Sequence, residues 1–340
     1  MPAVDPGLSN AVSAAGPTEP VARLWETPVG GGPSAPILAD ETVFVGLDAG
    51  RVVALDARIG DRVWTRPLEH PAGRPWVVDE HLVVPVEGGL VALSTADGGH
   101  EWRVSTTNRA GLAVSPAGVF VLEAGPPTRV RALATGDGSH RWTTAIDDPW
   151  SAPVFVGGGR VFVSSGTHDV RFWTLDPDSG DRVGPAPRPG SDFPAEHFYR
   201  RGSVFAADAF FGTVRATSVT DYGRGWSRGV GAVGRAAMSG DDDLVYYAAT
   251  NGDRPGLYAL STADGAVRWT APVSTDPVFR PVVGTEAVLL RTGEELRALH
   301  PADGTTRWHR PADPFGDAVI VADDLLYTTA GGAVRAFRPP

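Results

Sequence analysis

Short apolar runs, separated by turns rich in Gly and Asp, follow one another from residue 21 to the end of the chain. In residues 42–47 (TVFVGL) and 51–57 (RVVALDA), apolar residues alternate with polar ones or form compact groups between turn residues. This pattern predicts strands rather than helices. Where an Asp-Gly pair separates two runs, as at Asp97-Gly98 and Asp264-Gly265, we expect a tight hairpin turn with positive φ at both residues.

One eleven-residue phrase, ALDARIGDRVW at residues 54–64, returns in altered form as ALSTADGGHEW, ALATGDGSHRW, ALSTADGAVRW and ALHPADGTTRW. Its last position is a landmark that recurs about every 40 residues. The landmarks are Trp25, Trp64, Trp102, Trp142, Gly184, Trp226, Trp269 and Trp308. Units of this length with four short strands each are typical of a β-propeller.

The Trp landmarks have a structural explanation, because a large ring at one fixed position per unit fills the wedge between neighbouring sheets. Gly184 departs from this rule. The segment GDRVG at residues 180–184 otherwise repeats GDRVW at residues 60–64. We therefore expect the blade that contains Gly184 to pack less well at its outer edge.

The two ends of the repeat predict a closed ring. After Trp308 the chain supplies three strands and stops, and the missing fourth strand is found at residues 21–29 (VARLWETPV). Pairing the first strand with the last three removes two exposed sheet edges. The fold class is therefore all-β, a single eight-bladed β-propeller over residues 21–340. Residues 1–20, rich in Pro, Ser, Ala and Gly, are expected to form a flexible leader.

The phrase A-L-D-x-x-x-G-x-x-x-W resembles the repeat of the PQQ-like eight-bladed propellers, and the likeness covers residues 21–340. This group includes quinone-dependent alcohol dehydrogenases, outer-membrane assembly scaffolds of the BamB type, and sensor domains of bacterial kinases. The dehydrogenase branch would imply a longer chain, adjacent cysteines and a calcium site. Because this sequence contains no Cys, we expect neither the quinone cofactor nor a metal. Fold alone leaves the function open.

Composition and charge exclude several classes of site. The formal charge of −10 argues against general binding to nucleic acid, and no apolar run is long enough to insert into a membrane. All 30 basic residues are Arg, which excludes the lysine of a phosphate-binding loop and a Schiff-base lysine. The first residues lack the features of a secretory signal. The sequence as it stands predicts a cytoplasmic protein, or an exported one from which a signal has been removed, and a monomer.

Function in a repeat protein is expected where the units differ, on loops that the rigid array carries. The position at the start of each inner strand holds Ala35, Arg74, Gly111, Ala152, Glu196, Arg235, Arg280 and Asp317. Three arginines and two carboxylates thus replace small residues at a position that should converge on the mouth of the central channel. Each arginine could donate paired hydrogen bonds to a carboxylate or phosphate. Alternatively, the five charges neutralise one another in a polar channel.

Neighbouring residues extend this candidate ligand site with Trp76, Trp150, His197 and Tyr199. Aromatic walls with a few charges suit a small-molecule pocket. Alternate residues of a strand point to opposite faces, so we expect about half of the aromatic rings near the channel to belong to the core. The segment RPGSDFPAEHFYRR (188–201) departs furthest from the repeat, and its loop is the first candidate for binding.

Catalytic signals are weaker. If the protein is an enzyme, Glu196, His197 and Asp317 are the candidate acid–base residues, with His168 beside Asp169 as another pair. The match of GVGAVG (229–234) to a dinucleotide motif is rejected because no helix follows it. DPDSGD (176–181) hints at a calcium loop but is also the ordinary turn of the repeat.

Two main hypotheses follow. The first is a binding or scaffold propeller that holds an anionic small molecule or an acidic peptide at the channel mouth. The second is a cofactor-independent enzyme, such as a lyase, cyclase or isomerase, that uses the same pocket. A module that binds a protein partner along a blade edge is a third interpretation.

Overall fold

The structure is a computed structural model of the 340-residue chain. The residues that it describes are 12–146, 154–165, 171–184, 194–208, 211–221, 225–252, 254–273, 275–278, 280–316 and 318–340. Within these ranges, the side chains of residues 164–165, 171, 194–196, 232–236, 250 and 252 are also left undescribed. The described residues contain no helix long and apolar enough to cross a membrane.

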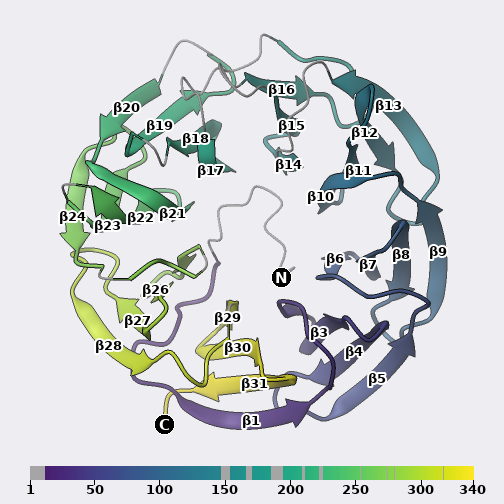
Figure 1. The fold of residues 1–340 in the computed structure, drawn as a ribbon, viewed down its shortest axis with the longest axis horizontal. Helices are drawn as coiled ribbons and strands as arrows, with labels where there is room; N and C mark the ends of the chain where they lie inside the picture. Colours follow the sequence, from purple (N-terminus) through teal and green to yellow (C-terminus); the bar gives the residue numbers. More distant parts are fainter. Residues whose placement is uncertain are drawn as a thin grey trace.

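The chain forms an eight-bladed β-propeller, as the repeat predicts (Figure 1). The blades are antiparallel sheets arranged in a ring around a central opening. The apolar core lies mainly between successive blades. One cluster, for example, joins Phe120 and Trp142 of the third blade to Val154 of the fourth. Each blade therefore buries its faces only against its neighbours, which is the rule for repeat proteins.

In the first four blades, each strand pairs with the next strand along the chain. The strands of blade 1 are β2 (Ile37–Ala39), β3 (Thr42–Leu47), β4 (Arg51–Asp56) and β5 (Arg62–Pro67). Those of blade 2 are β6 (Trp76–Val78), β7 (His81–Val86), β8 (Gly89–Ser94) and β9 (His100–Ser105). Those of blade 3 are β10 (Arg109–Ser115), β11 (Gly118–Glu123), β12 (Thr128–Leu133) and β13 (His140–Ile146). Those of blade 4 are β14 (Val154–Gly157), β15 (Arg160–Ser165) and β16 (Arg171–Leu175).

The next three blades repeat this order, and the eighth combines both ends of the chain. The strands of blade 5 are β17 (Pro194–Arg200), β18 (Ser203–Asp208), β19 (Thr213–Ser218) and β20 (Gly225–Gly229). Those of blade 6 are β21 (Ala232–Gly240), β22 (Leu244–Gly252), β23 (Gly256–Ser261) and β24 (Val267–Ala271). Those of blade 7 are β25 (Val282–Val283), β26 (Val288–Arg291), β27 (Glu295–Leu299) and β28 (Thr306–Pro311). Those of blade 8 are β29 (Val319–Ala322), β30 (Leu325–Ala330), β31 (Ala333–Arg338) and β1 (Ala22–Pro28).

The N-terminal strand closes the ring, as the sequence predicts. Strand β1 pairs antiparallel with β31, with Ala22 opposite Arg338 and Pro28 opposite Ala333 (Figure 1). The closure is reinforced between blades 8 and 1, because the Tyr327 hydroxyl donates a hydrogen bond of 3.1 Å to the carbonyl oxygen of Ala57.

Each landmark Trp packs on the next blade around the ring. The indole Nε1 of Trp64 donates to the carbonyl oxygen of Thr95 at 3.0 Å, and that of Trp102 to Thr135 at 2.9 Å. A Cβ added to Gly98 would lie 2.8 Å from the ring of Trp64. The repeated Gly and Trp therefore form one contact, in which the glycine of a blade makes room for the ring of the blade before it.

The hairpin prediction needs a correction. Gly98, Gly138, Gly265 and Gly304 have positive φ, but the Asp before each of them does not. The turns are longer than expected, since Gly98 N donates to Ser94 O at 2.9 Å. The Asp97 carboxylate instead accepts a hydrogen bond of 2.8 Å from Gly99 N. Asp is therefore favoured here because its carboxylate accepts a hydrogen bond from the backbone of the turn. Gly is favoured because its position has a positive φ.

Blade 4, in which Gly184 replaces the landmark Trp, has a reduced outer edge. Among the described residues its fourth strand consists of one bridge between Leu175 and Arg182, with Val183 N donating to Thr174 O at 2.8 Å. The Arg182 guanidinium lies over the ring of Trp173, 2.9 Å from its centroid.

The predicted leader extended to residue 20, but its described part, residues 12–20, lies against the propeller. We call these residues the N-terminal strap. Val12 N donates to Val283 O at 2.8 Å, and Gly16 N donates to Asp323 O at 3.2 Å. The strap thus contacts blades 7 and 8 through its backbone, which composition alone did not indicate.

Candidate functional site

A cavity of about 1520 Å³ lies in the central channel. Inner strands β2, β6, β25 and β29 contribute to its wall, together with the turns that follow the inner strands of blades 1, 6, 7 and 8. Arg74 and Arg280, two of the predicted ligand-binding residues, both line this cavity. The repeat therefore brings together two arginines that are about 200 residues apart in sequence, because each precedes the inner strand of its blade.

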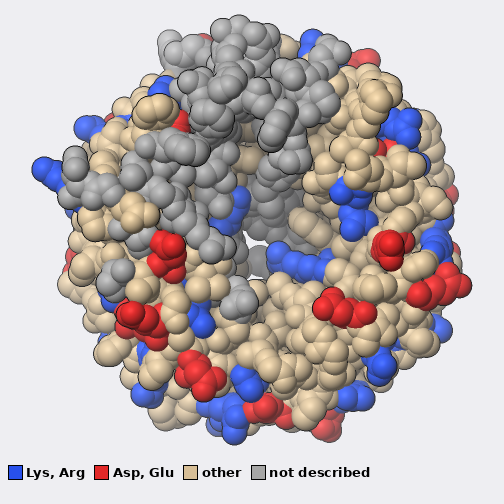
Figure 2. Space-filling view, viewed as in Figure 1, with Lys and Arg blue, Asp and Glu red and all other residues tan. Residues whose placement is uncertain are grey.

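Arg74 is an exposed cation in the wall of the channel. Its guanidinium lies 6.0 Å from the ring centroid of Trp76, which also lines the cavity. No ion pair joins Arg74 to any carboxylate among the described residues. The surrounding protein lowers the pKa of Arg74 by desolvation, but a guanidinium stays protonated in proteins. Figure 2 shows basic side chains at the edge of the central opening.

Two more arginines in the cavity wall, Arg58 and Arg200, were not among the predicted site residues. Arg58 forms an ion pair with Glu41. Arg200 is engaged by Asp242, since Arg200 Nε lies 2.6 Å from Asp242 Oδ1, and Arg201 Nε lies 3.1 Å from Asp242 Oδ2. The hydrogen bond from Arg200 is the largest cause of the lowered pKa of Asp242. This pair connects the inner turns of blades 5 and 6, so Arg200 is less available to a ligand than Arg74.

Acidic residues of the turns that follow the inner strands also line the cavity: Asp40, Glu41, Asp241, Asp242, Asp243 and Asp323. Asp241 is occupied by its own turn, since its carboxylate accepts hydrogen bonds from Asp243 N and Leu244 N at 2.8 Å. Sequence reasoning missed this wall because it compared only the positions that precede the inner strands. Comparing the positions that follow them would have found Asp40, Asp241 and Asp323.

His197 does not line the cavity. It is only 4% exposed and lies between Phe155 and Phe172, whose ring centroids are 5.0 and 5.5 Å from the imidazole centroid. Neither ring nitrogen has a hydrogen-bond partner among the described residues. Burial, with a smaller contribution from the positive charge of Arg280, lowers the pKa of His197 to about 3. A neutral, enclosed imidazole is poorly suited to acid–base chemistry on a ligand in the channel.

Tyr199 is held by packing between blades 4 and 5. Its ring stacks on Phe162 with centroids 5.8 Å apart, and its hydroxyl accepts a hydrogen bond of 3.1 Å from Gly202 N. Phe198, between His197 and Tyr199, is fully buried in the cluster shared by blades 5 and 6. The alternation of strand residues thus places these aromatic side chains in the core on both faces of blade 5.

The remaining predicted site residues are only partly described. Glu196 lies in β17 and Arg235 in β21, but their side chains are outside the described residues. Trp150 and Asp317 lie wholly outside the described residues, as do His168 and Asp169. The assignment of Glu196, Arg235, Trp150 and Asp317 to the channel mouth stays a prediction, as does the acid–base role of His168 and Asp169.

The DPDSGD segment serves as a repeat turn. The Asp176 carboxylate accepts hydrogen bonds from Asp178 N at 2.8 Å and Ser179 N at 2.9 Å, and these bonds lower its pKa. Asp178 pairs with Arg141 at 2.8 Å. Within the described ranges, no group of three or more His, Asp or Glu side chains is placed to hold a metal ion.

The sequence matches the family model described as outer membrane protein assembly factor BamB over residues 12–125, 87–193 and 210–339. The chain belongs to this family. The outer membrane protein assembly factor BamB of Alkalilimnicola ehrlichii is 29% identical over 171 residues, which cover 45% of this chain and 43% of that relative. The match to this curated relative therefore spans less than half of its length.

Solved structures agree with this fold. BamB from Moraxella catarrhalis has a TM-score of 0.69 at 15% identity, covering 94% of this BamB-family chain and 98% of that one. Quinohemoprotein alcohol dehydrogenase from Comamonas testosteroni has a TM-score of 0.66 at 14% identity, covering 94% and 76% of the two chains. The two neighbours differ in function, so their likeness supports the propeller and not a particular activity.

Proposed function

We propose that this chain is a binding and scaffold propeller that holds an anionic small molecule or an acidic peptide in its central channel. The observation that carries the proposal is Arg74, which faces the cavity without a carboxylate partner among the described residues. A cation in a partly desolvated wall is compensated most effectively by an anion that brings its own oxygen atoms.

The neighbours of Arg74 favour this kind of ligand. Arg280 lines the same cavity and adds a second positive charge to its wall, and the ring of Trp76 supplies an apolar surface beside Arg74. Arginine is suited to this role because its planar fork donates two parallel hydrogen bonds to one carboxylate or phosphate. We include Arg235 in the site because it occupies the corresponding position in blade 6.

The proposal is tested by thermal unfolding with two probes, citrate and a hexaglutamate peptide, each compared with sodium chloride at equal ionic strength. We expect both probes to raise the Tm of the parent protein. Arg74→Ala should lose most of the rise, and Arg235→Ala/Arg280→Ala should abolish it. Arg268→Ala removes an exposed arginine from the outer strand β24 and should retain the full rise. An equal rise in all variants, or no rise in the parent, would overturn the site.

We also propose a protein partner and an exported location. The relatives are named outer membrane protein assembly factors, which supports a scaffold that works with other proteins and weakens the expectation of a cytoplasmic location. Fractionation of the native host and cross-linking there would test both points. Recovery of the chain in the cytosol without a cross-linked partner would contradict them.

The enzyme hypothesis has less support. Of its three candidate residues, only the His197 side chain is described, and it is buried away from the cavity with a pKa of about 3. Full activity of His197→Gln against any substrate found would remove His197 from the mechanism.

A further inference from the structure

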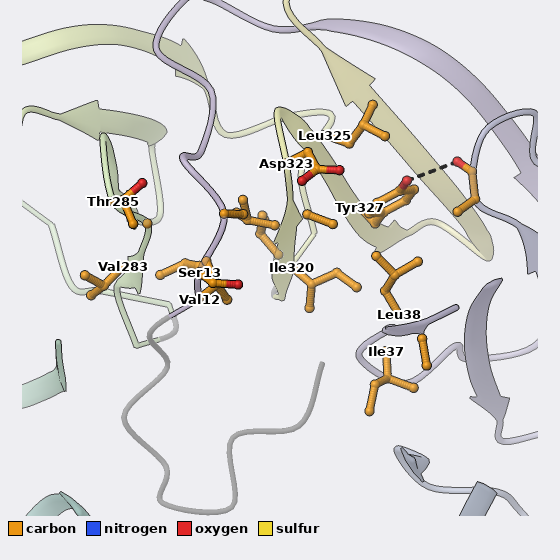
Figure 3. A pocket seen from close by; sticks show the side chains of 18 of the residues that line it. Val12, Ser13, Ile37, Leu38, Val283, Thr285, Ile320, Asp323, Leu325 and Tyr327 are labelled. Carbon is orange, nitrogen blue, oxygen red and sulfur yellow. Dashed lines mark hydrogen bonds between the residues drawn. The ribbon is translucent and has the colours of Figure 1, made fainter. Parts of the chain in front are cut away.

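The N-terminal strap occupies a groove between the inner turns of blades 7 and 8. Ala14 O accepts a hydrogen bond of 2.9 Å from Thr285 N, and Ala15 O accepts hydrogen bonds from Glu286 N and Ala287 N at 2.9 and 3.1 Å. Figure 3 shows Val12 and Ser13 between Val283 and Thr285 on one side and Ile320 and Asp323 on the other. We call the surface formed by Val283–Ala287 and Asp323 the strap groove.

Gly284 makes the strap groove accessible to another backbone. Its φ is outside the left-handed region, so its conformation does not require glycine. A Cβ added there would lie 2.6 Å from Ala15 O and 2.9 Å from Ala14 O. The residues that directly follow the inner strands of blades 1, 2 and 8 are Asp40, Asp79 and Asp323. Blade 7 has glycine at this position, and the strap backbone lies where a side chain would stand.

The strap meets this space with small side chains. Ser13, Ala14, Ala15 and Gly16 follow one another, and a Cβ on Gly16 would approach Ala287 Cβ to 3.3 Å. Gly16 also has a φ of 77°, which disfavours other residues. Val12 and Ala14 pack against the apolar cluster of blades 7 and 8 but remain partly exposed. The groove therefore selects an apolar residue followed by small residues and a glycine, and it holds them through backbone hydrogen bonds.

We propose that the strap groove is a peptide-binding surface, occupied here by the chain's own strap, that takes a partner's segment of the same small-residue type by displacing the strap. Backbone hydrogen bonds would give affinity, and the tight fit at Gly284 and Ala287 would give specificity. Val12, Ser13 and Ala14 also line the channel cavity. Displacement of the strap therefore changes the wall of the cavity. This inference does not depend on anion binding.

The first test asks whether Gly284 holds the strap. The chain has no Cys, so Ser13→Cys creates a unique site for a nitroxide label. We expect slow label motion in this parent, and fast motion when Gly284→Ala is added. The matched control is Gly293→Ala, in the β26–β27 turn of the same blade, where an added Cβ meets no atom of the described residues within 4 Å. Equal label motion in both variants, each with a cooperative thermal transition, would overturn the role of Gly284.

The second test supplies the peptide from outside. Gly16→Val should loosen the strap while leaving the strap groove unchanged. A fluorescent peptide of residues 10–20 (NAVSAAGPTEP) should bind this variant when the peptide is supplied at concentrations of up to about 1 mM. A short tether gives the chain's own strap an effective concentration of that order. It should not bind Gly16→Val/Gly284→Ala, and a peptide that itself carries Gly16→Val should not bind either protein. Equal binding to both proteins, or no binding to the first, would overturn the proposal.

Discussion

The indole Nε1 of Trp308 donates a hydrogen bond of 2.9 Å to the carbonyl oxygen of Pro17, which lies 291 residues earlier in the chain. In other blades the equivalent indole binds the turn of the next blade, as Trp269 does with Pro301 at 2.7 Å. At the closure of the ring, the strap takes the place of that turn. The repeat contact is therefore completed by a segment that does not contain the repeated phrase.

Trp308→Phe tests this closure contact. It removes the indole N–H and leaves the buried carbonyl of Pro17 without this donor, so we expect a loss of about 1–2 kcal/mol in the free energy of unfolding. Trp64→Phe, whose indole binds Thr95 in the uninterrupted part of the array, should lose a similar amount. Denaturant unfolding of both variants provides the measurement. A loss in Trp64→Phe alone would show that the strap does not act as a blade turn.

Gly304→Ala tests the second half of the repeat contact. Gly304 has a φ of 72°, and a Cβ there would lie 2.3 Å from the ring of Trp269. The backbone cost and the overlap together predict a loss of roughly 2–5 kcal/mol in unfolding free energy. Gly229→Ala is the control, since its Cβ meets no described atom within 4 Å and its φ is unexceptional. Similar midpoints for the two variants in denaturant would contradict this interpretation.

Glu123 is a buried carboxylate, 2% exposed, at the end of β11. It lies 2.8 Å from Arg129 Nε and 3.1 Å from Arg131 Nη2, and it accepts a hydrogen bond from Thr107 N at 3.2 Å. Glu123→Ala should destabilise the protein by about 1–3 kcal/mol, because it removes a buried acceptor that binds two partly exposed arginines and a backbone N–H. Arg129→Ala should cost about 1 kcal/mol or less, since Arg129 is 43% exposed and Arg131 remains. Thermal or denaturant unfolding that ranked the two in the opposite order would refute this assignment.

His197→Phe should raise the free energy of unfolding at pH 7 by about 1–3 kcal/mol, because it removes two buried nitrogen atoms that have no hydrogen-bond partner in the described part of the chain. The ring should fit beside Phe155 and Phe172.

The same variant predicts a pH dependence. The folded-state pKa of His197 is about 3, below its ordinary value of 6.5, so the unfolded chain binds the extra proton between these values. The contribution of neutral His197 to the free energy of unfolding is therefore fully present above pH 6.5, and it decreases as the pH falls toward 3. Between pH 7 and pH 4 the parent should lose about 3 kcal/mol more than His197→Phe. Parallel pH curves for the two proteins would mean that His197 is accessible to protons in the folded state.

The sequence predicted the ring of blades because almost every unit repeats the same pattern of strand and turn residues. Alternating apolar residues define each strand, the Gly of the phrase makes the turn, and Trp64 or Trp102 packs on the Gly of the following blade. The reduced outer edge of blade 4 was also predictable, because Gly184 lacks the ring that packs on the next blade in the other units. The turn geometry at Asp97-Gly98 was mispredicted because a side-chain acceptor and a positive φ both favour Asp and Gly.

The sequence by itself determined the eight-bladed array and its closure by residues 21–29, since a repeated phrase encodes contacts between neighbours that are the same everywhere. Only the tertiary structure decided where individual side chains point. His197 enters the core beside Phe155 and Phe172, and Arg74 lines the channel. His197 directly follows the position that the repeat aligns with Arg74, so contacts with the neighbouring blade, and not the repeat, decide which side chain is buried. The strap groove likewise depends on tertiary structure, because only folding brings the strap next to Gly284.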